Sequence, residues 1–317
     1  MILMFNRWRT TAAVLASAVV LASAGCAAAP ATAEPSDGKL QVMASIYPLM
    51  YVTQQIAGTY ADVSVLTPIG TEPHDYDPTP QQMAALSKAT LVVYQAGVDA
   101  AVDDMVAQAN PAHTIETGAL VPKLLPATDD GDPDGPPGYT STYEYNPHTW
   151  LDPTNMIRFG DAIATELAKL DPADAAGYQA NQAAFTAQMN QLDEQFTTGL
   201  AHCNTNVFMT THAAFGYFAQ RYGLTQLAIA GVSPDDEPSP MHMGELAVQA
   251  QQHHLTTVFF ETMVSPAYAD TLAYDLGLRT DVLDPIEGVT SASRGTNYLQ
   301  IMQSNLKALQ QADGCTS

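Results

Sequence analysis

The chain has 317 residues and is strongly acidic, with 33 Asp and Glu residues against 11 Lys and Arg residues and a formal net charge of −22. This charge argues against nucleic acids and anionic membrane surfaces as partners, because both would repel the protein. It favours cations, although only diffusely. About 280 residues follow the N-terminal segment, which is enough for two lobes that each have a hydrophobic core.

Residues 1–25 resemble an export signal. Arg7 and Arg9 form a basic N-terminal region, and the apolar run that follows, TAAVLASAVVLA, is too short to span a bilayer comfortably. Removing this signal leaves nine basic and 33 acidic side chains, a net charge of −24. Residues 26–38 are mostly small and polar, with Pro and Gly, which is typical of a flexible tether. No later apolar stretch approaches the ~20 residues that a membrane-spanning helix needs.

Cys26 is a candidate lipidation site. The run LASAGC ends at this residue, as bacterial lipoprotein signals do, although Ser23 stands where such signals usually have Leu. Cleavage after residues 31–33, an A-T-A pattern, is the alternative and would discard Cys26. Both interpretations place the mature protein outside the cytoplasm, either anchored to the cell membrane by lipid or released as a secreted or periplasmic protein.

Short β-prone runs alternate with helical patterns along most of the chain. We expect strands at 41–45, 61–66, 90–94, 113–116, 206–210, 225–229, 256–260 and 280–284. We expect helices at 47–58, 79–89, 98–109, 213–223, 243–254, 265–277 and 296–311. One helix start is especially clear, with Thr79 as N-cap, Pro80 at the first helical position and Gln82 closing a capping box. Strands that alternate with helices of this length predict an α/β fold with parallel sheets.

Two segments interrupt this alternation. Residues 126–147 are rich in Asp, Gly and Pro and predict a long loop. Residues 172–202 are interpreted as a connecting helix, whose helical pattern over roughly 173–201 would be about 43 Å long at 1.5 Å per residue. This helix divides the chain into an N-terminal metal-binding lobe, 39–171, and a C-terminal metal-binding lobe, 203–317, each with about four strand–helix units.

Four candidate metal ligands lie just past runs that are predicted as strands: His74, His148, His212 and Asp284. In open α/β sheets, ligands bind beyond the carboxyl ends of the strands, where several loops can reach a common point. Three neutral imidazoles and one carboxylate can complete the four-coordinate shell that Zn²⁺ prefers. An isolated loop histidine is more often a surface residue, so the prediction depends on all four residues sharing this position.

Other residues near these positions give weaker indications. Glu261, at the end of an expected strand, is interpreted as a hydrogen-bond acceptor behind a ligand, with direct ligation as the alternative. Glu72 and Asp75 flank His74 and could orient its imidazole, although solvated loop carboxylates fit equally well. Trp150 is interpreted as core packing beside the site. The remaining histidines lie outside this pattern: His113, His202, His242, His253 and His254.

Cys203 and Cys315 fit an oxidising compartment. A disulfide between them would fasten the C-terminal tail to the second half of the chain. A metal site with two thiol ligands is the alternative, and no C-x-x-C spacing supports it.

Five motifs follow one another along the chain: PHDYDPTP at 73–80, PHTWLDP at 147–153, THAAFGYFAQRYG at 211–223, FFETMVSP at 259–266 and LDPIEG at 283–288. They resemble the motifs of the solute-binding proteins of zinc and manganese ABC importers, the ZnuA- and TroA-like group of metal-binding lipoproteins (cluster A-I). The resemblance covers nearly the whole mature chain and implies two (β/α)4-type lobes joined by a single long helix, with the metal between the lobes. The metal-binding positions of the group fall here on His74, His148, His212 and Asp284. Relatives specialised for zinc often have a His-rich loop before the second ligand, where this chain has the acidic loop 126–147.

The leading hypothesis is a monomeric binding protein, not an enzyme, that captures Zn²⁺ outside the cytoplasm and delivers it to a membrane permease. Mn²⁺ is the alternative cargo. A nitrogen-rich shell favours zinc, since manganese prefers oxygen donors. Manganese-specialised relatives tend to replace the third histidine by a carboxylate, whereas this chain keeps His212. A secreted metallohydrolase and a surface adhesin are more remote alternatives; the sequence has no H-E-x-x-H motif, and protein ligands fill all four positions.

Overall fold

The strands form two separate parallel sheets. The structure, a computed structural model, describes residues 38–124 and 144–316. In this part of the chain, the first four-stranded sheet has the order β2-β1-β3-β4 and the second has the order β6-β5-β7-β8. All neighbouring strands in both sheets are parallel, so the predicted α/β fold with two parallel sheets is confirmed. The strands are β1 (Leu40–Ala44), β2 (Ala61–Val65), β3 (Leu91–Tyr94), β4 (Thr114–Glu116), β5 (Val207–Thr210), β6 (Thr225–Ala228), β7 (Thr257–Phe260) and β8 (Arg279–Val282).

Helices connect the strands at the places where the sequence predicts them. The described helices are α1 (Tyr47–Ala57), α2 (Pro80–Leu86), α3 (Ala100–Ala109), α4 (Pro153–Leu170), α5 (Ala175–Gly199), α6 (Gly216–Tyr222), α7 (Pro240–Gln252), α8 (Ala267–Leu276) and α9 (Tyr298–Ala312), with short 3-10 turns η1 (Thr117–Leu120) and η2 (Thr149–Leu151). The capping box at Thr79 and Gln82 forms as predicted. Helix α3 begins two residues later than predicted, because the Asp99 side chain accepts the backbone N–H groups of Ala101 and Val102 and so acts as the N-cap.

Both sheets contribute to one continuous hydrophobic core, which also includes α1, α4, α5 and α9. The opposite face of the first sheet packs on α2 and α3 through a separate apolar cluster. The opposite face of the second sheet packs on α7 and α8 through another. Strands β3, β5 and β7 lie inside their sheets and are almost entirely buried, which explains why their sequences are apolar runs rather than alternating patterns.

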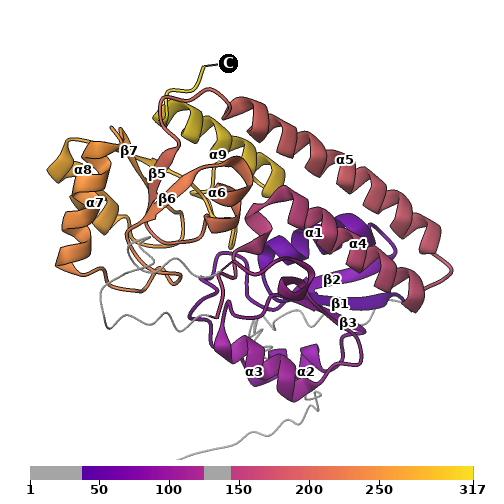
Figure 1. Ribbon diagram of the computed structural model, residues 1–317. Helices are drawn as coiled ribbons and strands as arrows, with labels where there is room; N and C mark the ends of the chain where they lie inside the picture. Colours follow the sequence, from indigo (N-terminus) through magenta and orange to yellow (C-terminus); the bar gives the residue numbers. More distant parts are fainter. Residues whose placement is uncertain (1–37, 125–143, 317) are drawn as a thin grey trace, which may run out of the picture. The chain divides into compact units, whose positions relative to one another are not determined.

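Helix α5 links the two halves of the fold. It has 25 residues and packs against α1 and α4 of the first half and α9 of the second (Figure 1). It is shorter than the predicted connecting helix at 172–202, because residues 172–174 form a turn before it. Tyr178, Phe185 and Phe196 are among its buried residues, so this helix contributes to the core as well as joining the lobes. Contacts place both sheets and α5 in one compact unit, Pro35–Ser317.

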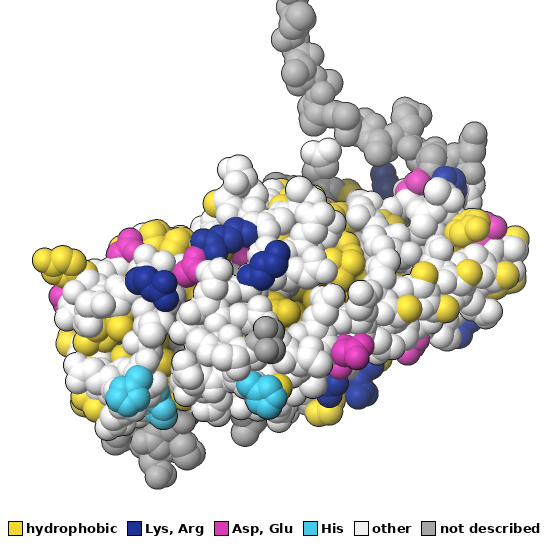
Figure 2. Space-filling view, turned by 90° about the horizontal axis from the view of Figure 1, so that it is seen from above, with side chains coloured by type: hydrophobic (Ala, Val, Ile, Leu, Met, Phe, Trp, Pro, Cys, Tyr) yellow, Lys and Arg dark blue, Asp and Glu magenta, His cyan; other side chains and the backbone are white. Residues whose placement is uncertain are grey.

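Cys203 and Cys315 form a disulfide, as predicted, which closes a segment with a sequence separation of 112 residues. Within the described ranges, no helix is both long enough and apolar enough to cross a membrane. On the face shown in Figure 2, Lys and Arg side chains lie among Asp and Glu side chains, with hydrophobic side chains between them. The acidic net charge is therefore not gathered into one patch on that face.

Candidate metal site

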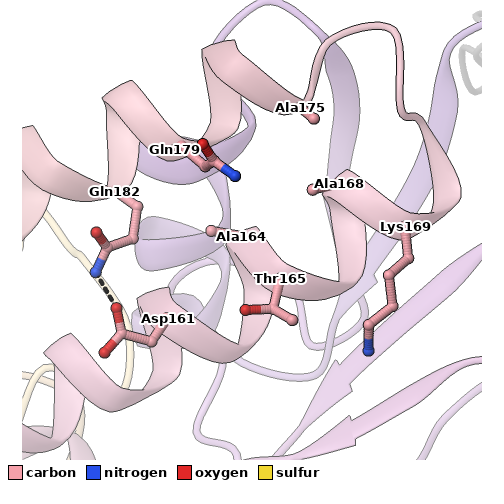
Figure 3. A pocket seen from close by; sticks show the side chains of 8 residues that line it. All are labelled: Asp161, Ala164, Thr165, Ala168, Lys169, Ala175, Gln179 and Gln182. Carbon is pink, nitrogen blue, oxygen red and sulfur yellow. Dashed lines mark hydrogen bonds between the residues drawn. The ribbon is translucent and has the colours of Figure 1, made fainter.

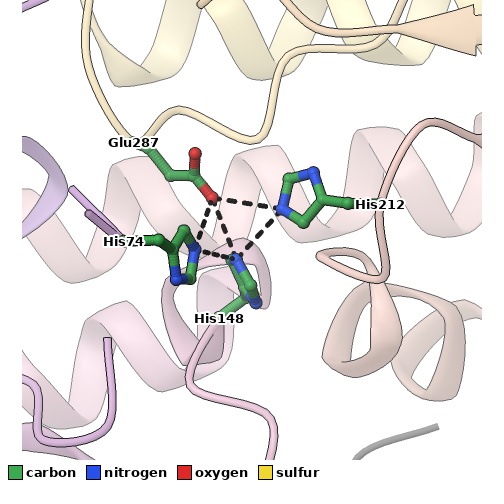
Figure 4. A group of neighbouring side chains, drawn as sticks. All are labelled: His74, His148, His212 and Glu287. Carbon is green, nitrogen blue, oxygen red and sulfur yellow. Dashed lines mark hydrogen bonds and ion pairs between the residues drawn. The ribbon is translucent and has the colours of Figure 1, made fainter. Parts of the chain in front are cut away.

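Three histidines and one glutamate bring their side chains to a common point (Figure 4). His74 lies in the loop between β2 and α2, and His148 directly precedes η2. His212 follows β5, and Glu287 lies in the segment after β8. All four side chains are almost completely buried, with at most 2% of any side chain exposed. The first half of the chain thus supplies two members of the group and the second half supplies the other two.

Five of the six distances among the four ligand atoms lie between 2.9 and 3.4 Å. His148 Nε2 is 3.1 Å from His74 Nε2 and 3.3 Å from His212 Nε2. Glu287 Oε1 lies 2.9 Å from His148 Nε2, 3.4 Å from His74 Nε2 and 3.3 Å from His212 Nε2. In the described part of the chain, these are the residues whose atoms could hold a metal ion together, since all the atoms lie within 4.8 Å of one another.

The other ring nitrogen of each histidine has an acceptor. His74 Nδ1 is 3.1 Å from the Val98 carbonyl oxygen, and His212 Nδ1 is 2.7 Å from Glu261 Oε1. Because a carbonyl or carboxylate oxygen can only accept, each Nδ1 must carry the proton. The Nε2 atom of each neutral ring then carries a lone pair that is directed at the common point. Acceptors of this kind are the usual partners that orient metal-binding histidines.

Asn146 performs the same task for His148. Its Oδ1 accepts the backbone N–H of His148 at 3.0 Å and lies 2.9 Å from His148 Nδ1. Its Nδ2 donates to the Ala213 carbonyl oxygen at 2.7 Å, which fixes the orientation of the amide. Ala213 is the neighbour of His212, so one side chain connects the segments that carry the second and third histidines.

The ionisable groups of the site shift one another's pKa values. Burial, the largest influence on His148, lowers the pKa of its imidazole to about 3 and keeps the ring neutral. Burial also disfavours a charge on His212, but Glu261 and Glu287 outweigh it and raise the pKa of His212 well above its ordinary value. Burial likewise opposes a charge on Glu287, but hydrogen bonds from the three histidines and the charge of His212 hold its pKa well below the usual range. A cation that binds here must therefore displace a proton from His212.

Glu72 lies beside this group. Its Oε1 accepts the backbone N–H of His74 at 3.1 Å, so it supports the backbone of that residue rather than its imidazole, which the Val98 carbonyl holds. Burial, followed by the charge of Glu287, raises the pKa of Glu72 to about 9. Asp75, the other carboxylate expected near His74, is exposed.

Asp284, the carboxylate predicted as the fourth ligand, does not lie in the group, and Glu287 occupies that place. Strand β8 ends at Val282, and the Asp284 side chain turns to other partners: Oδ1 accepts the backbone N–H of Ile286 at 2.8 Å and Oδ2 accepts the Thr262 hydroxyl at 3.2 Å. The longer Glu287 side chain, three residues further on, reaches the histidines instead. In contrast to the prediction, the structure thus places Glu287, and not Asp284, among the possible ligand atoms.

The remaining predicted residues have clear positions. Glu261 accepts hydrogen bonds from Thr211 Oγ1 at 2.6 Å and from His212 Nδ1, so it lies behind His212 and not in the group of ligand atoms. Trp150 is completely buried, with its ring 5.2 Å from that of His148. Cys26 and most of the loop 126–147 lie outside the described residues. None of the five other histidines belongs to the described group of possible ligands.

A hollow between α4 and α5 lies elsewhere (Figure 3). Its lining includes small side chains such as Ala164 and Ala168, and Gln182 donates a hydrogen bond to Asp161 across it. The ammonium group of Lys169 is paired with Glu166 at 2.9 Å. Asp161, Lys169 and Gln182 of this hollow thus each have a partner, and the described residues of the hollow hold no convergent group of ligand atoms like that of the histidines.

The protein has two α/β lobes, each with a parallel sheet, one linking helix, and a buried group of three histidines and a carboxylate. These features define the class of metal solute-binding proteins. The family described as zinc-uptake complex component A, periplasmic (ZnuA) matches residues 42–312. The chain belongs to this ZnuA family.

Relatives of known identity resemble it over most of its length. The zinc-binding lipoprotein AdcA of Streptococcus pneumoniae strain R6 is 36% identical over 287 residues, which cover 87% of this chain and 56% of that protein. The high-affinity zinc uptake system protein ZnuA of Bacillus subtilis strain 168 is 31% identical over 311 residues, which cover 96% of this chain and 98% of that protein. The crystal structure of Zn(II)-bound AdcA from Streptococcus pneumoniae has a TM-score of 0.72 at 33% identity, covering 87% of this chain and 58% of that one. The chain thus spans just over half the length of AdcA.

Proposed function

We propose that this protein captures Zn²⁺ outside the cytoplasm and delivers it to the permease of an ABC importer. The observation that carries the proposal is the convergence of three imidazole Nε2 atoms and Glu287 Oε1, with five of their six separations at 2.9–3.4 Å and all within 4.8 Å. Three lone pairs and a carboxylate at such distances repel one another unless a proton or a cation lies between them. The names of the relatives, a zinc-binding lipoprotein and a zinc uptake protein, support zinc as that cation.

The proposed ligands are His74, His148, His212 and Glu287. Zinc binds imidazole nitrogen at about 2.0–2.1 Å, so neighbouring ligand atoms of a tetrahedral site lie about 3.3 Å apart. Five of the six separations are close to this value. Mn²⁺ prefers six ligands and more oxygen donors, which this group does not supply.

The same geometry supports transport rather than hydrolysis. A catalytic zinc needs an open position for water or substrate, whereas four protein groups complete the tetrahedral shell here. The chain belongs to a family of zinc-uptake components, and we propose that it has no enzymatic activity of its own. Cargo release then requires the two lobes to alter the positions of their ligands, because each lobe contributes two of the four.

The matched family is one of extracytoplasmic uptake components. We propose that this protein is held at the membrane by lipid on Cys26, a residue that lies outside the described part of the chain. The name of AdcA, a lipoprotein, supports this assignment. We further propose that the protein acts as a monomer with the permease as its partner, since the metal group is complete within one chain.

Elemental analysis of protein purified without added metal tests the cargo, with an expected content of one zinc per chain. Competition with a chromogenic chelator then tests the site, comparing wild type with His212→Ala. His253→Ala is the matched control, because His253 is exposed and lies outside the group of ligands. The proposal requires severe loss in the first variant and none in the control. Equal affinities in all three proteins would exclude this site.

A further inference from the structure

The segment that carries Glu287 contains an unusual backbone conformation. Ile286 has a φ of 62°, and among the described residues only Asn110 and His254 are other non-glycine residues with positive φ. The left-handed region is unfavourable for a β-branched side chain, because its Cβ substituents crowd the backbone. Ile286 is also completely buried, so its conformation is imposed by its surroundings.

The side chain of Asp284 supplies a direct reason for this conformation. Its Oδ1 accepts the backbone N–H of Ile286 at 2.8 Å, and its Oδ2 accepts the hydroxyl of Thr262 at 3.2 Å. Asn305 on α9 fixes the backbone of Asp284 in both directions, since Asn305 Oδ1 accepts its N–H at 2.9 Å and Asn305 Nδ2 donates to its carbonyl at 2.7 Å. Asp284 and Asn305 are both buried, so these bonds do not compete with bulk water.

Residues of the first lobe also contact the segment 284–288. Trp150 Nε1 donates to the Pro285 carbonyl oxygen at 2.8 Å, and the hydroxyl of Tyr298 donates to the Trp150 carbonyl oxygen at 2.7 Å. Gly288 permits a further close approach, because a Cβ there would lie 2.8 Å from Met263 Sδ and 3.2 Å from the backbone nitrogen of Gly70. Hydrogen bonds to the backbone of Pro285 and Ile286 on one side, and the close approach at Gly288 on the other, therefore restrict where Glu287 points.

We propose that Asp284 is a positioning residue for the metal site, which holds Ile286 in the left-handed conformation and so directs the Glu287 carboxylate at the three histidines. This inference rests on the proposed function, in which Glu287 is a zinc ligand. Asp284 acts through the backbone of Ile286 and does not touch the metal. A carboxylate or amide oxygen at position 284 satisfies the requirement, whereas a methyl group does not.

A double-mutant cycle separates this role from a general contribution to the fold. Zinc affinity is measured by chelator competition for wild type, Asp284→Ala, Glu287→Gln and the double variant. We expect Asp284→Ala to weaken zinc binding by roughly 10-fold to 100-fold in the wild-type background, the range found for residues that orient metal ligands. In the Glu287→Gln background, the same substitution should cost less than about threefold, because the residue it positions no longer ligates.

Asp284→Asn is the conservative variant, since its Oδ1 can still accept the Ile286 N–H. It should restore most of the affinity lost in Asp284→Ala. An equal loss from Asp284→Ala with and without the Glu287 carboxylate would overturn the proposal, because a general effect on the fold acts in both backgrounds. An Asp284→Asn variant as weak as Asp284→Ala would also overturn it.

Thr262→Val provides a second route if Asp284→Ala does not fold. It removes the hydroxyl that donates to Asp284 Oδ2 and leaves the carboxylate in place. We expect a smaller loss of zinc affinity that again disappears in the Glu287→Gln background; a loss that persists there overturns the proposal.

If His212→Ala bound zinc as tightly as wild type, the proposed function itself would fail. A failure confined to the Asp284 and Thr262 variants overturns the positioning role alone.

Discussion

Asn146 Oδ1 lies within hydrogen-bond distance of two atoms of His148, the backbone nitrogen at 3.0 Å and the ring Nδ1 at 2.9 Å. The amide thereby selects the tautomer in which His148 Nε2 has a free lone pair. Its Nδ2 bonds to the backbone beside His212, so the same side chain also sets the spacing of two ligands from different lobes. One residue therefore both orients a ligand and makes a hydrogen bond between the two lobes.

Replacing this amide should weaken zinc binding without removing a ligand. We expect Asn146→Ala to lose roughly 10-fold to 100-fold in zinc affinity, as is common when the partner of a metal-binding histidine is removed. Asn181→Ala is the control, because Asn181 also bonds a distant backbone carbonyl, that of Ile56 at 3.0 Å, but belongs to α5. Chelator competition measures both. Unchanged affinity in Asn146→Ala would show that His148 needs no such partner.

Zinc affinity should rise with pH across the neutral range. The pKa of His212 is raised well above its ordinary value, because Glu261 and Glu287 outweigh the effect of burial. The imidazolium cannot ligate, so zinc must displace its proton, and each binding event should release protons. His148, with a pKa lowered to about 3, does not contribute. Calorimetry in two buffers of different ionisation enthalpy measures the protons released.

The raised pKa of His212 should also make the metal-free protein less stable as the pH rises. A histidine whose pKa is raised on folding contributes stability that is fully present below its unfolded pKa of about 6.5 and is lost as the pH rises through the folded value. Unfolding of the metal-free protein should therefore become easier as the pH increases through that range, while zinc binding becomes tighter.

A zinc affinity that stays flat between about pH 6 and 9 would contradict the protonation assigned to His212.

The disulfide should contribute stability without affecting the cargo. The Cys203–Cys315 bridge closes a loop with a sequence separation of 112, worth at most about 4–5 kcal/mol in the chain-entropy model. The variant Cys203→Ser/Cys315→Ser should unfold at lower denaturant concentration and bind zinc as wild type does. Neither cysteine belongs to the group of possible ligands. Two free thiols in denatured, unreduced wild-type protein would refute the bridge.

The site should prefer Zn²⁺ to Mn²⁺. Three nitrogen donors and one carboxylate fit tetrahedral zinc, and zinc outranks manganese at most sites with nitrogen and oxygen ligands. Titration calorimetry of the metal-free protein with each ion measures the two affinities directly. Tighter manganese binding would mean that additional oxygen ligands, for example from Glu72 or Glu261, join the shell.

The strand pattern and the histidines could be predicted from the sequence, because both depend on local signals. Apolar runs followed by turns gave the positions of all eight described strands to within a few residues. His212 lies just beyond β5 as expected, whereas His74 lies further along the loop after β2 and His148 directly precedes η2 rather than following a strand. The structure nevertheless brings their Nε2 atoms together.

The fourth member of the group could not be chosen by the same logic. The motif LDPIEG contains two carboxylates, and Asp284 is the one nearer to the strand. Only the left-handed conformation of Ile286 and the contacts of Asp284 with Thr262 and Asn305 show that Glu287 reaches the histidines. These contacts join residues far apart in the sequence, and no local pattern encodes them. Asn146 was missed for the same reason, since its partner Ala213 is 67 residues away.

The choice between the two carboxylates provides the most direct test of the site. Zinc affinity is measured for Glu287→Gln and Asp284→Asn under identical conditions, since each substitution replaces a carboxylate by an amide of the same shape. We predict that Glu287→Gln loses at least about 100-fold, because it removes a charged ligand, whereas Asp284→Asn loses far less, because an amide oxygen can still accept the Ile286 N–H. Severe loss in Asp284→Asn together with near-normal binding in Glu287→Gln would contradict the site described here.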